Sequence, residues 1–279
     1  MRLTFARKRR LKNAGLMLLN LPLIFIIILP LIYTLCISVM PADEIYDNVL
    51  IPSSVSFDNY VRAFTNPAYS FLGYIKNSFI TSITVMLAQM LTCSLAAFSF
   101  SFLDFKGKNL LFILVLSTMM VPGEATIIAN YLTISRWGWL DSYQALILPY
   151  TTSALGIFLL RQHYLTFPKE LREASLIDGC NNMRFLRSIV FPLSKPALGA
   201  LGAYVFLNTW NQYMWPLLVT NSDAYRTVQV GISMLYDIDA EALGLMMAGV
   251  IIVIVPSLSI FVFMQKQLIN GLMTGAVKG

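Results

Sequence analysis

Six long stretches of this chain are almost free of charge, and they limit the folds that it can adopt. Five of them hold between 19 and 30 consecutive uncharged residues: 13–42, 77–103, 142–160, 196–222 and 242–265. The sixth, 109–135, contains one charged residue, Glu124. A helix needs about 20 apolar residues to cross the ~30 Å hydrocarbon core of a bilayer. Since only 12% of all residues are charged, against about 25% in a typical soluble domain, the sequence predicts an all-α polytopic membrane protein with six transmembrane helices.

The transmembrane domain is predicted to cover residues 14–263. Its six spans are placed at 14–39, 78–102, 110–131, 142–160, 196–219 and 242–263. The second span is rich in Ser, Thr and Ala. Such residues let membrane helices pack closely, so this span is expected inside the helix bundle. The third span is predicted to break at Pro122 and Gly123, because proline interrupts the hydrogen-bond pattern of a helix.

The positions of Lys and Arg predict the orientation of the spans. With the N-terminus in the cytoplasm, four inner segments hold 16 of the 20 Lys and Arg residues: 1–12, 103–109, 161–195 and 264–279. Three outer segments hold the other four: 40–76, 132–141 and 220–241. Inner loops of membrane proteins are enriched in Lys and Arg. Both termini are therefore predicted to be cytoplasmic, with a basic tail at 1–13 and a second tail at 264–279.

The basic tail accounts for the net charge of +6, because its six Lys and Arg residues precede the first acidic residue. It lies next to a span, which favours contact with anionic lipid over binding of nucleic acid. A cleaved signal peptide is the alternative interpretation of the first span. The apolar run from Leu16 to Val39 is longer than the roughly 7–15 residues of a signal-peptide core, which favours an uncleaved span.

The sequence shows no pattern typical of catalysis or metal binding. His163 is the single histidine, and Cys36, Cys93 and Cys180 are not spaced as a disulfide framework or a metal site. The chain has no phosphate-binding loop of the type GxxxxGK[ST]. We therefore predict no catalytic residue, no metal and no directly bound cofactor, so energy-driven work would need a partner protein.

Polar side chains inside the predicted spans are candidates for a substrate pathway. Glu124 is the only charged residue in a span, and a carboxylate near the bilayer centre marks a functional candidate because its burial is costly. Alternatively, Pro122 and Gly123 end the helix near the outer interface and leave Glu124 in a hydrated crevice. The fifth span adds the candidates Asn208, Asn211, Gln212 and Tyr213. Amides and aromatic rings bind sugars, although polar contacts between helices use the same residue types.

The segment 161–195 is long for a connector between spans. Residues Lys169–Ile177 are mostly helix formers and are followed by Gly179, which predicts a short helix that stops at this glycine. A second short helix is predicted over Met183–Val190, ending before Pro192. Two amphipathic helices on the cytoplasmic side suit either docking to a soluble protein or contact with the lipid surface.

This segment resembles the EAA loop of binding-protein-dependent ABC importer permeases. The matching residues are Glu173, Ala174, Ser175, Asp178, Gly179, Phe185, Ile189, Pro192 and Pro196. Two positions depart from the usual pattern, Ser175 and Cys180, and both replace alanine with another small residue. Further motifs resemble the carbohydrate-uptake branch of this family: Asn77-Ser78, Leu148-Pro149, residues 210–216 and the tail 271–279. The resemblance covers nearly the whole chain.

The resemblance implies the ABC type I importer fold and a place in the bacterial cytoplasmic (inner) membrane. The residues implied in coupling to an ATPase are Glu173, Ala174, Ser175, Asp178, Gly179, Phe185 and Pro192. The implied partners are a second, homologous permease subunit that completes a heterodimer, two ATPase subunits that use ATP and Mg²⁺, and an extracytoplasmic solute-binding protein or lipoprotein. The residues implied in contact with that binding protein are Asn221, Asp223, Arg226 and Asp237.

The substrate implied by the resemblance is a carbohydrate or a glycerophosphate compound. A phosphate would need a cationic site, and no predicted span contains Lys or Arg. This favours a neutral mono- or oligosaccharide over sn-glycerol-3-phosphate or a glycerophosphodiester. A secondary transporter is a weaker alternative, because such proteins need carboxylates for a coupling ion and usually contain inverted repeats, whereas the spans hold one carboxylate.

Overall fold

The computed structural model of the chain is helical and describes the backbone of residues 2–45, 47, 49–66, 70–238 and 243–273. Side chains are described over the same ranges except for residues 2–19, 236–238, 264 and 266–273. The chain divides into two compact units, Met1–Pro67 with Ile232–Ile252, and Ala68–Gly231 with Val253–Gly279. Two helices continue from one unit into the other, α13 (Val228–Ile238) and α14 (Leu243–Met273).

The first unit contains α1 (Arg2–Ser38) and α2 (Asp58–Thr65). The end of α1 is tied to α2 by Asn59, whose Nδ2 donates to the carbonyl oxygens of Ser38 and Met40, at 3.3 Å each. Asn59 is buried, so these bonds satisfy an amide that would otherwise be costly to remove from water.

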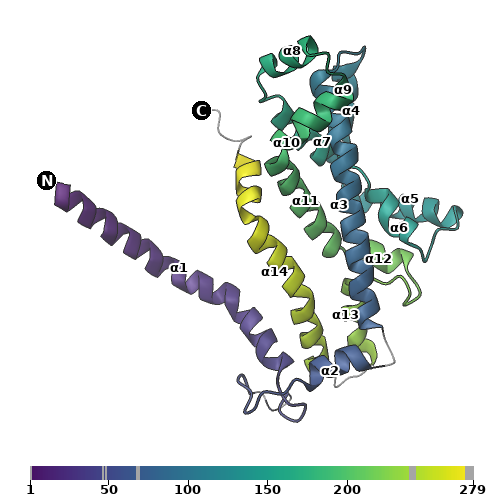
Figure 1. Ribbon diagram of the computed structural model, residues 1–279. Coiled ribbons are helices and arrows are strands. Elements are labelled where there is room, and N and C mark those ends of the chain that lie inside the picture. The colour runs from purple at the N-terminus through teal and green to yellow at the C-terminus, as the bar shows by residue number, and fades with distance from the viewer. Residues whose placement is uncertain (1, 46, 48, 67–69, 239–242, 274–279) are drawn as a thin grey trace. The chain divides into compact units, whose positions relative to one another are not determined.

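The second unit is built on the long helix α3, which is shown running through it in Figure 1. The elements of this unit are, in chain order, α3 (Phe71–Phe102), α4 (Lys108–Ser117), η1 (Thr118–Met120), α5 (Gly123–Arg136), α6 (Tyr143–Ile147), η2 (Leu148–Tyr150), α7 (Ala154–Tyr164), α8 (Lys169–Ile177), α9 (Asn182–Phe185), η3 (Leu186–Val190), α10 (Phe191–Leu193), α11 (Lys195–Trp210) and α12 (Met214–Val219).

Helices α7 and α11 pack closely against α3. A side chain at Gly156 of α7 would bring its Cβ to 2.8 Å from the Sγ of Cys93, and one at Gly202 of α11 would lie 3.2 Å from the Sδ of Met90. Small residues allow such close approach between membrane helices. The Ser-, Thr- and Ala-rich second span therefore packs against α7 and α11 on one side, while Ile83, Leu87 and Leu91 on another side are exposed.

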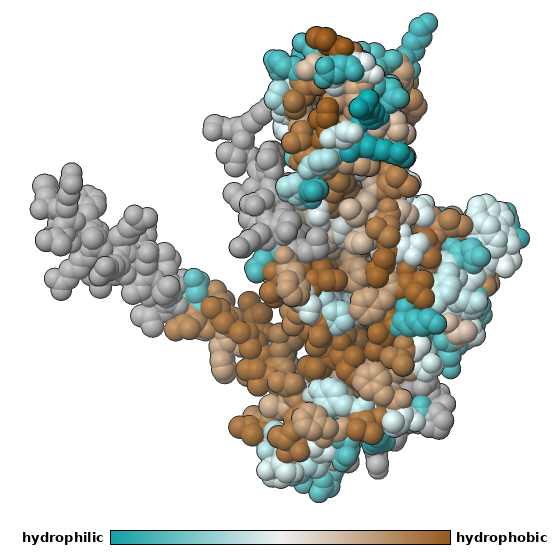
Figure 2. Space-filling view, in the orientation of Figure 1, coloured by the Kyte–Doolittle hydropathy of each residue, from teal (hydrophilic) through white to brown (hydrophobic). Residues whose placement is uncertain are grey.

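An apolar core surrounds the end of α3 near Phe102. It consists of buried residues from α3, α4, α7, α9, η3 and α11, among them Phe98, Phe112, Leu160, Tyr164 and Phe185. In Figure 2 the surface along α3 and its neighbours is largely hydrophobic, whereas hydrophilic residues gather at the end of the unit that carries α8 and α9.

The described residues contain three helices that are long and apolar enough to cross a membrane alone: Asn20–Ser38, Phe71–Phe102 and Leu243–Phe263. Three bent pairs would add one span each: Lys108–Met120 with Gly123–Arg136, Tyr143–Tyr150 with Ala154–Tyr164, and Asn182–Leu193 with Lys195–Trp210. The chain thus has between three and six candidate spans. The predicted break near Pro122 is confirmed, and the two helices on either side of it meet at 98°.

The predicted fifth span, 196–219, needs correction. The helix α11 ends at Trp210 and α12 starts at Met214. Asn211 leaves the regular helix after donating its N–H to the carbonyl of Leu207, and Pro216 lies within the first turn of the new helix, where its missing N–H is least costly.

Candidate functional site

The helix α8 has the bounds predicted for it, Lys169–Ile177. It ends in two hydrogen bonds of the Schellman type, from the N–H of Gly179 to the carbonyl of Leu176 (3.0 Å) and from the N–H of Cys180 to the carbonyl of Ser175 (2.8 Å). Gly179 has a φ of +68°, a left-handed conformation that glycine adopts at little cost. The stop predicted at this glycine is confirmed.

One face of α8 is buried against the rest of the second unit, and another face is exposed. Ser175 is only 4% exposed, and its hydroxyl donates to the carbonyl of Arg172 at 2.7 Å. By contrast, Glu173 and Ala174 are exposed, and Ile177 is 87% exposed. An isoleucine left so open at the end of an ordered helix suits a surface that another protein covers.

Arg172 connects α8 to the core. Its Nη2 donates to the Oδ1 of Asn182, and its guanidinium carbon lies 4.8 Å from the ring centre of Phe185, which is the geometry of a cation–π contact. Phe185 is fully buried and meets Phe102 of α3 edge-on, with ring centres 5.3 Å apart. Two side-chain contacts, Arg172 with Phe185 and Phe185 with Phe102, thus connect α8 to α3.

The second helix of this segment is longer than predicted. The helical chain continues through α9, η3 and α10 as far as Leu193, rather than ending before Pro192. Asn181 caps its start by accepting the N–H of Arg184 at 2.8 Å. The π-helical turn η3 shifts the backbone hydrogen-bond pattern just before Pro192. Pro192 then lies in the first turn of α10, where a backbone N–H is not required as a donor.

Among the residues implied in coupling, the structure separates an outer and an inner group. Glu173, Ala174, Asp178, Gly179 and Pro192 are exposed. Ser175 and Phe185 are buried within the second unit. The buried pair therefore supports the exposed residues and does not itself face a partner.

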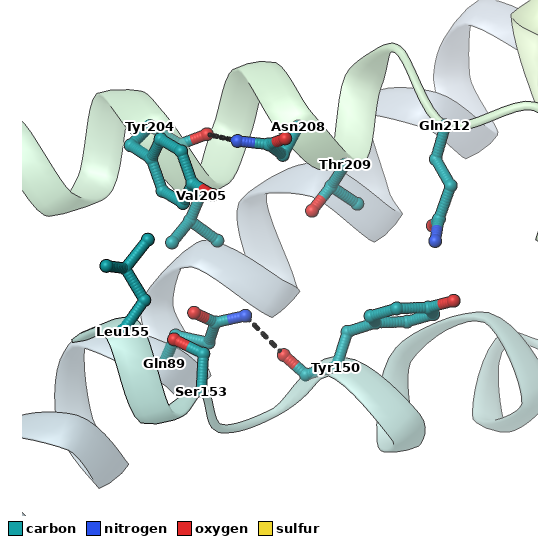
Figure 3. Close-up of a pocket in the computed structure, with 9 residues that line it drawn as sticks. All are labelled: Gln89, Tyr150, Ser153, Leu155, Tyr204, Val205, Asn208, Thr209 and Gln212. Atoms are coloured by element: carbon teal, nitrogen blue, oxygen red, sulfur yellow. Dashed lines mark hydrogen bonds between the residues drawn. The ribbon is translucent and has the colours of Figure 1, made fainter. Parts of the chain in front are cut away.

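A polar cavity of about 330 Å³ lies between α3, the start of α7 and α11 (Figure 3). Its lining consists of Gln89, Tyr150, Ser153, Leu155, Tyr204, Val205, Asn208, Thr209 and Gln212. Two predicted pathway residues, Asn208 and Gln212, are among them. In Figure 3, Thr209 of α11 and Gln212, which follows this helix, extend toward Gln89 and Tyr150.

The other predicted pathway residues lie outside this lining. Asn211 and Tyr213 are exposed in the break after α11, where the Oδ1 of Asn211 accepts a hydrogen bond from Gln229 (3.3 Å). Glu124 is exposed in the first turn of α5, where a carboxylate is favoured by the helix dipole. Of the two interpretations of Glu124, this placement fits a helix that ends at the proline.

Sequence reasoning missed five polar residues of the cavity: Gln89, Tyr150, Ser153, Tyr204 and Thr209. Gln89 carried a usable signal, because it is an amide inside an otherwise apolar and hydroxyl-rich stretch. The others offered none, since Ser, Thr and Tyr are frequent in this chain.

The segment 221–228 is clamped to the other end of α3. Asn77 donates its Nδ2 to the carbonyls of Ala224 (2.9 Å) and Arg226 (3.0 Å) and accepts the hydroxyl of Tyr143 (2.6 Å). The hydroxyl of Ser78 accepts the N–H of Val228 at 2.9 Å. The motif Asn77-Ser78 thus holds this segment in place.

Three of the four residues implied in binding-protein contact, Asn221, Asp223 and Arg226, belong to this clamp. Asp223 accepts the hydroxyl of Tyr74 (2.7 Å) and pairs with Arg226 (2.6 Å), which also donates to the carbonyl of Asn221 (2.8 Å). Within the predicted outer segment 220–241, the helix α13 starts at Val228. Asp237 lies in α13, but its side chain is outside the described residues.

Asp141 completes the clamp from the segment before α6. Its Oδ1 accepts the N–H groups of Asn221 (2.6 Å) and Ser222 (2.8 Å). Partial burial would raise the pKa of Asp141, but these N–H groups, the Ser222 hydroxyl and Arg226 outweigh it and hold the pKa below the ordinary value for Asp. The charged carboxylate is therefore part of the folded arrangement.

Comparison with known proteins identifies the family. Residues 89–268 match the model of the binding-protein-dependent transport system inner membrane component. The chain is 33% identical to the trehalose/maltose transport system permease protein MalG of Thermococcus litoralis, over 98% of this chain and 99% of that protein. It is 32% identical to the arabinooligosaccharides transport system permease protein AraQ of Halalkalibacterium halodurans, over 91% and 92%. It is 34% identical to the sn-glycerol-3-phosphate transport system permease protein UgpE of Rhizobium meliloti, over 89% and 92%.

The fold agrees with this assignment. A solved chain of a bacterial ABC transporter involved in the import of the acidic polysaccharide alginate superposes with a TM-score of 0.84, covering 93% of this chain and 97% of the other at 19% identity. The chain therefore belongs to the binding-protein-dependent transport system inner membrane components, as the non-catalytic, multi-pass permease of an ABC transporter.

Proposed function

We propose that this permease imports a neutral mono- or oligosaccharide and that α8 is the helix through which an ATPase subunit drives it. The observation that carries the coupling part is the presentation of α8, which exposes Glu173, Ala174 and Ile177. Arg172 anchors the helix through Asn182 and Phe185, and Ser175 is buried. On a helix, residues 170, 173, 174 and 177 share one side. That side offers two acidic residues around an apolar centre, which suits a groove with basic and apolar side chains.

The energy would come from partner chains. Two ATPase subunits would bind ATP and Mg²⁺, and a second permease subunit would complete the pathway. Closure of the ATPase pair would move α8, and the Arg172–Phe185 contact would pass this motion to α3. The side of the membrane on which α8 lies is inferred from the Lys and Arg distribution.

A carbohydrate is supported by the relatives MalG and AraQ, whose names specify trehalose/maltose and arabinooligosaccharides. UgpE supports sn-glycerol-3-phosphate as the second candidate. We favour the neutral sugar because a phosphate buried in a span needs a cationic partner, and the predicted spans contain no Lys or Arg. Asn208, Asn211, Gln212, Tyr213 and Glu124 remain the proposed pathway residues.

We further propose that Asn221, Asp223, Arg226 and Asp237 form part of the surface that meets the solute-binding protein. The first three are held by the clamp at α3. A surface that is already ordered loses less entropy when a partner binds.

The test is uptake by the assembled transporter in proteoliposomes, with ATP inside and the binding protein outside. The probes are maltose, trehalose, arabinotriose and sn-glycerol-3-phosphate. We expect Glu173→Lys to reduce ATP-driven uptake of the transported probe at least ~10-fold, because it reverses the charge of the proposed contact.

Asp104→Lys is the matched control, since Asp104 is another fully exposed acid on the same predicted side and its replacement changes the charge of that side equally. Full uptake by Glu173→Lys, at equal membrane insertion of both variants, would contradict the assignment of α8 to coupling.

A further inference from the structure

The cavity between α3, α7 and α11 contains a buried acceptor that has no partner. Gln89 is 8% exposed, and its Nε2 donates to the carbonyl of Tyr150 at 2.8 Å. A carbonyl can only accept, so this bond sets the orientation of the amide. The Oε1 of Gln89 is then left buried and without a hydrogen bond among the described residues.

A second amide of the lining, Asn208, differs from Gln89 in being exposed and in bonding within its own helix. Asn208 donates its Nδ2 to the carbonyl of Tyr204 at 2.9 Å, which leaves its Oδ1 as an acceptor. The same lining includes the hydroxyls of Ser153 and Thr209. The two amide oxygens accept and the hydroxyls both donate and accept, which suits the hydroxyl groups of a sugar ring, since these also donate and accept.

The chemistry of the lining also excludes a strongly charged ligand. None of its nine residues is Lys, Arg, Asp or Glu, so a phosphate or carboxylate would enter the cavity without a counter-charge. The ring of Tyr150 lies at the floor of the view in Figure 3, beside Gln212, and offers an apolar face to the C–H groups of a sugar. The volume of about 330 Å³ is near the lower end for small-molecule pockets, which suits one sugar ring with its water.

We infer that this cavity is a sugar subsite contributed by this subunit, in which the Gln89 Oε1 accepts a hydrogen bond from a ring hydroxyl of a neutral saccharide. This inference rests on the proposed carbohydrate import and adds to it that this chain contacts the sugar through α3, in addition to the fifth-span residues.

The test compares Gln89→Leu with Thr92→Val in the complete transporter. Thr92 lies one turn further along α3, and its hydroxyl donates to the carbonyl of Thr151 at 2.7 Å. Both substitutions remove a side-chain bond from α3 to the segment 150–151, but Thr92 is not part of the cavity lining. For the neutral sugar that the native complex imports, we expect Gln89→Leu to raise KM about tenfold and to lower the maximal rate by a smaller factor. Thr92→Val should keep the native KM.

A second measurement does not depend on removing Gln89. Thr209→Cys places a thiol in the lining, and its modification by a small methanethiosulfonate reagent is followed by peptide mass spectrometry. We expect the imported sugar to slow this modification several-fold, whereas sn-glycerol-3-phosphate should leave it unchanged.

Three results would overturn the inference: equal KM values for Gln89→Leu and Thr92→Val, modification of Thr209→Cys that sugar does not slow, or loss of the second permease subunit from the Gln89→Leu complex but not from the Thr92→Val complex. The last result would mean that a side chain of the partner fills the cavity. Failure of the proposed function is distinguishable, because it would appear in the native complex as import of sn-glycerol-3-phosphate alone or as no ATP-driven import.

Discussion

The segments 168–185 and 221–228 lie at opposite ends of α3 and are attached to it in different ways. The first meets α3 through the aromatic ring of Phe185, which contacts Phe98 and Phe102, and Arg172 of α8 lies over this ring. The second is held by a dense set of short hydrogen bonds from Tyr74, Asn77 and Ser78. If α8 transmits motion as proposed, its few attachments and exposed face suit that role, whereas the many hydrogen bonds of the segment 221–228 suit a rigid surface.

The largest expected effect concerns the open face of α8. Ile177→Asp should reduce co-purification of the ATPase subunits at least ~10-fold, since a charge at the centre of an apolar contact removes its main source of affinity. Affinity purification of the tagged permease with quantification of the bound ATPase measures it.

Ile51→Asp is the matched control, because Ile51 is 75% exposed and lies outside the segment 161–195. If both variants retain the ATPase equally, the exposed face of α8 is not the surface that binds the ATPase.

A smaller effect is expected for the attachment of α8. Arg172→Ala should raise the ATP hydrolysed per sugar imported several-fold, because loss of the cation–π contact, worth about 0.5–2 kcal/mol, loosens the link between α8 and α3. Arg172→Lys should fall between, since it keeps the charge but lacks the planar guanidinium. The measurement is the ratio of ATPase activity to uptake in proteoliposomes.

Arg184→Ala, which removes an exposed arginine from the adjacent helix α9, should leave this ratio unchanged. A native ratio in Arg172→Ala would show that the motion of α8 reaches the core by another route.

The clamp at the other end of α3 predicts that the segment 221–228 becomes less firmly held when Asn77 is replaced. Asn77→Ala removes three side-chain hydrogen bonds and strands the carbonyls of Ala224 and Arg226, at a cost of about 1–3 kcal/mol. Trypsin should then cut after Arg226 several-fold faster in the detergent-purified complex, as followed by mass spectrometry of the fragments.

Thr133→Ala serves as the comparison, because its hydroxyl bonds only within its own helix, to the carbonyl of Ala129. Equal cleavage of both variants would mean that Asn77 does not hold the segment.

The smallest effect depends on pH. Because the pKa of Asp141 is lowered in the folded chain, its contribution to stability is fully present above the unfolded value of about 4 and is lost as the pH falls through the lower folded value. The difference in melting temperature between the native chain and Asp141→Asn should therefore be largest near pH 7 and shrink below about pH 4. Thermal unfolding at several pH values checks it, and a difference that stays constant down to about pH 3 would contradict the role of the charge.

Local signals in the sequence were sufficient for α8 and for the break at Pro122. Helix formers followed by Gly179 define α8 within about ten residues of chain, and a proline acts on the helix that contains it. Such features depend on neighbours along the chain, so no knowledge of the tertiary fold was needed to place them.

The cavity and the clamp could not be predicted in this way. Gln89 meets the carbonyl of Tyr150 across 61 positions, and Asn77 meets that of Ala224 across 147. Polar residues of common types give no signal of pairing over such separations. The continuation of the helix past Pro192 was also missed. Here the cause is the π-helical turn before this proline, which shifts the backbone hydrogen-bond pattern.

The sequence by itself determined that the chain is a helical membrane protein, that α8 is a helix ending at a glycine, and that these residues resemble a coupling loop, because hydropathy, proline and glycine act locally. Only the tertiary structure decided which side chains of α8 are open, which residues anchor the outer segment, and that Gln89 shares a cavity with Asn208. These properties depend on the close packing of α3, α7 and α11, which small residues such as Gly156 and Gly202 permit.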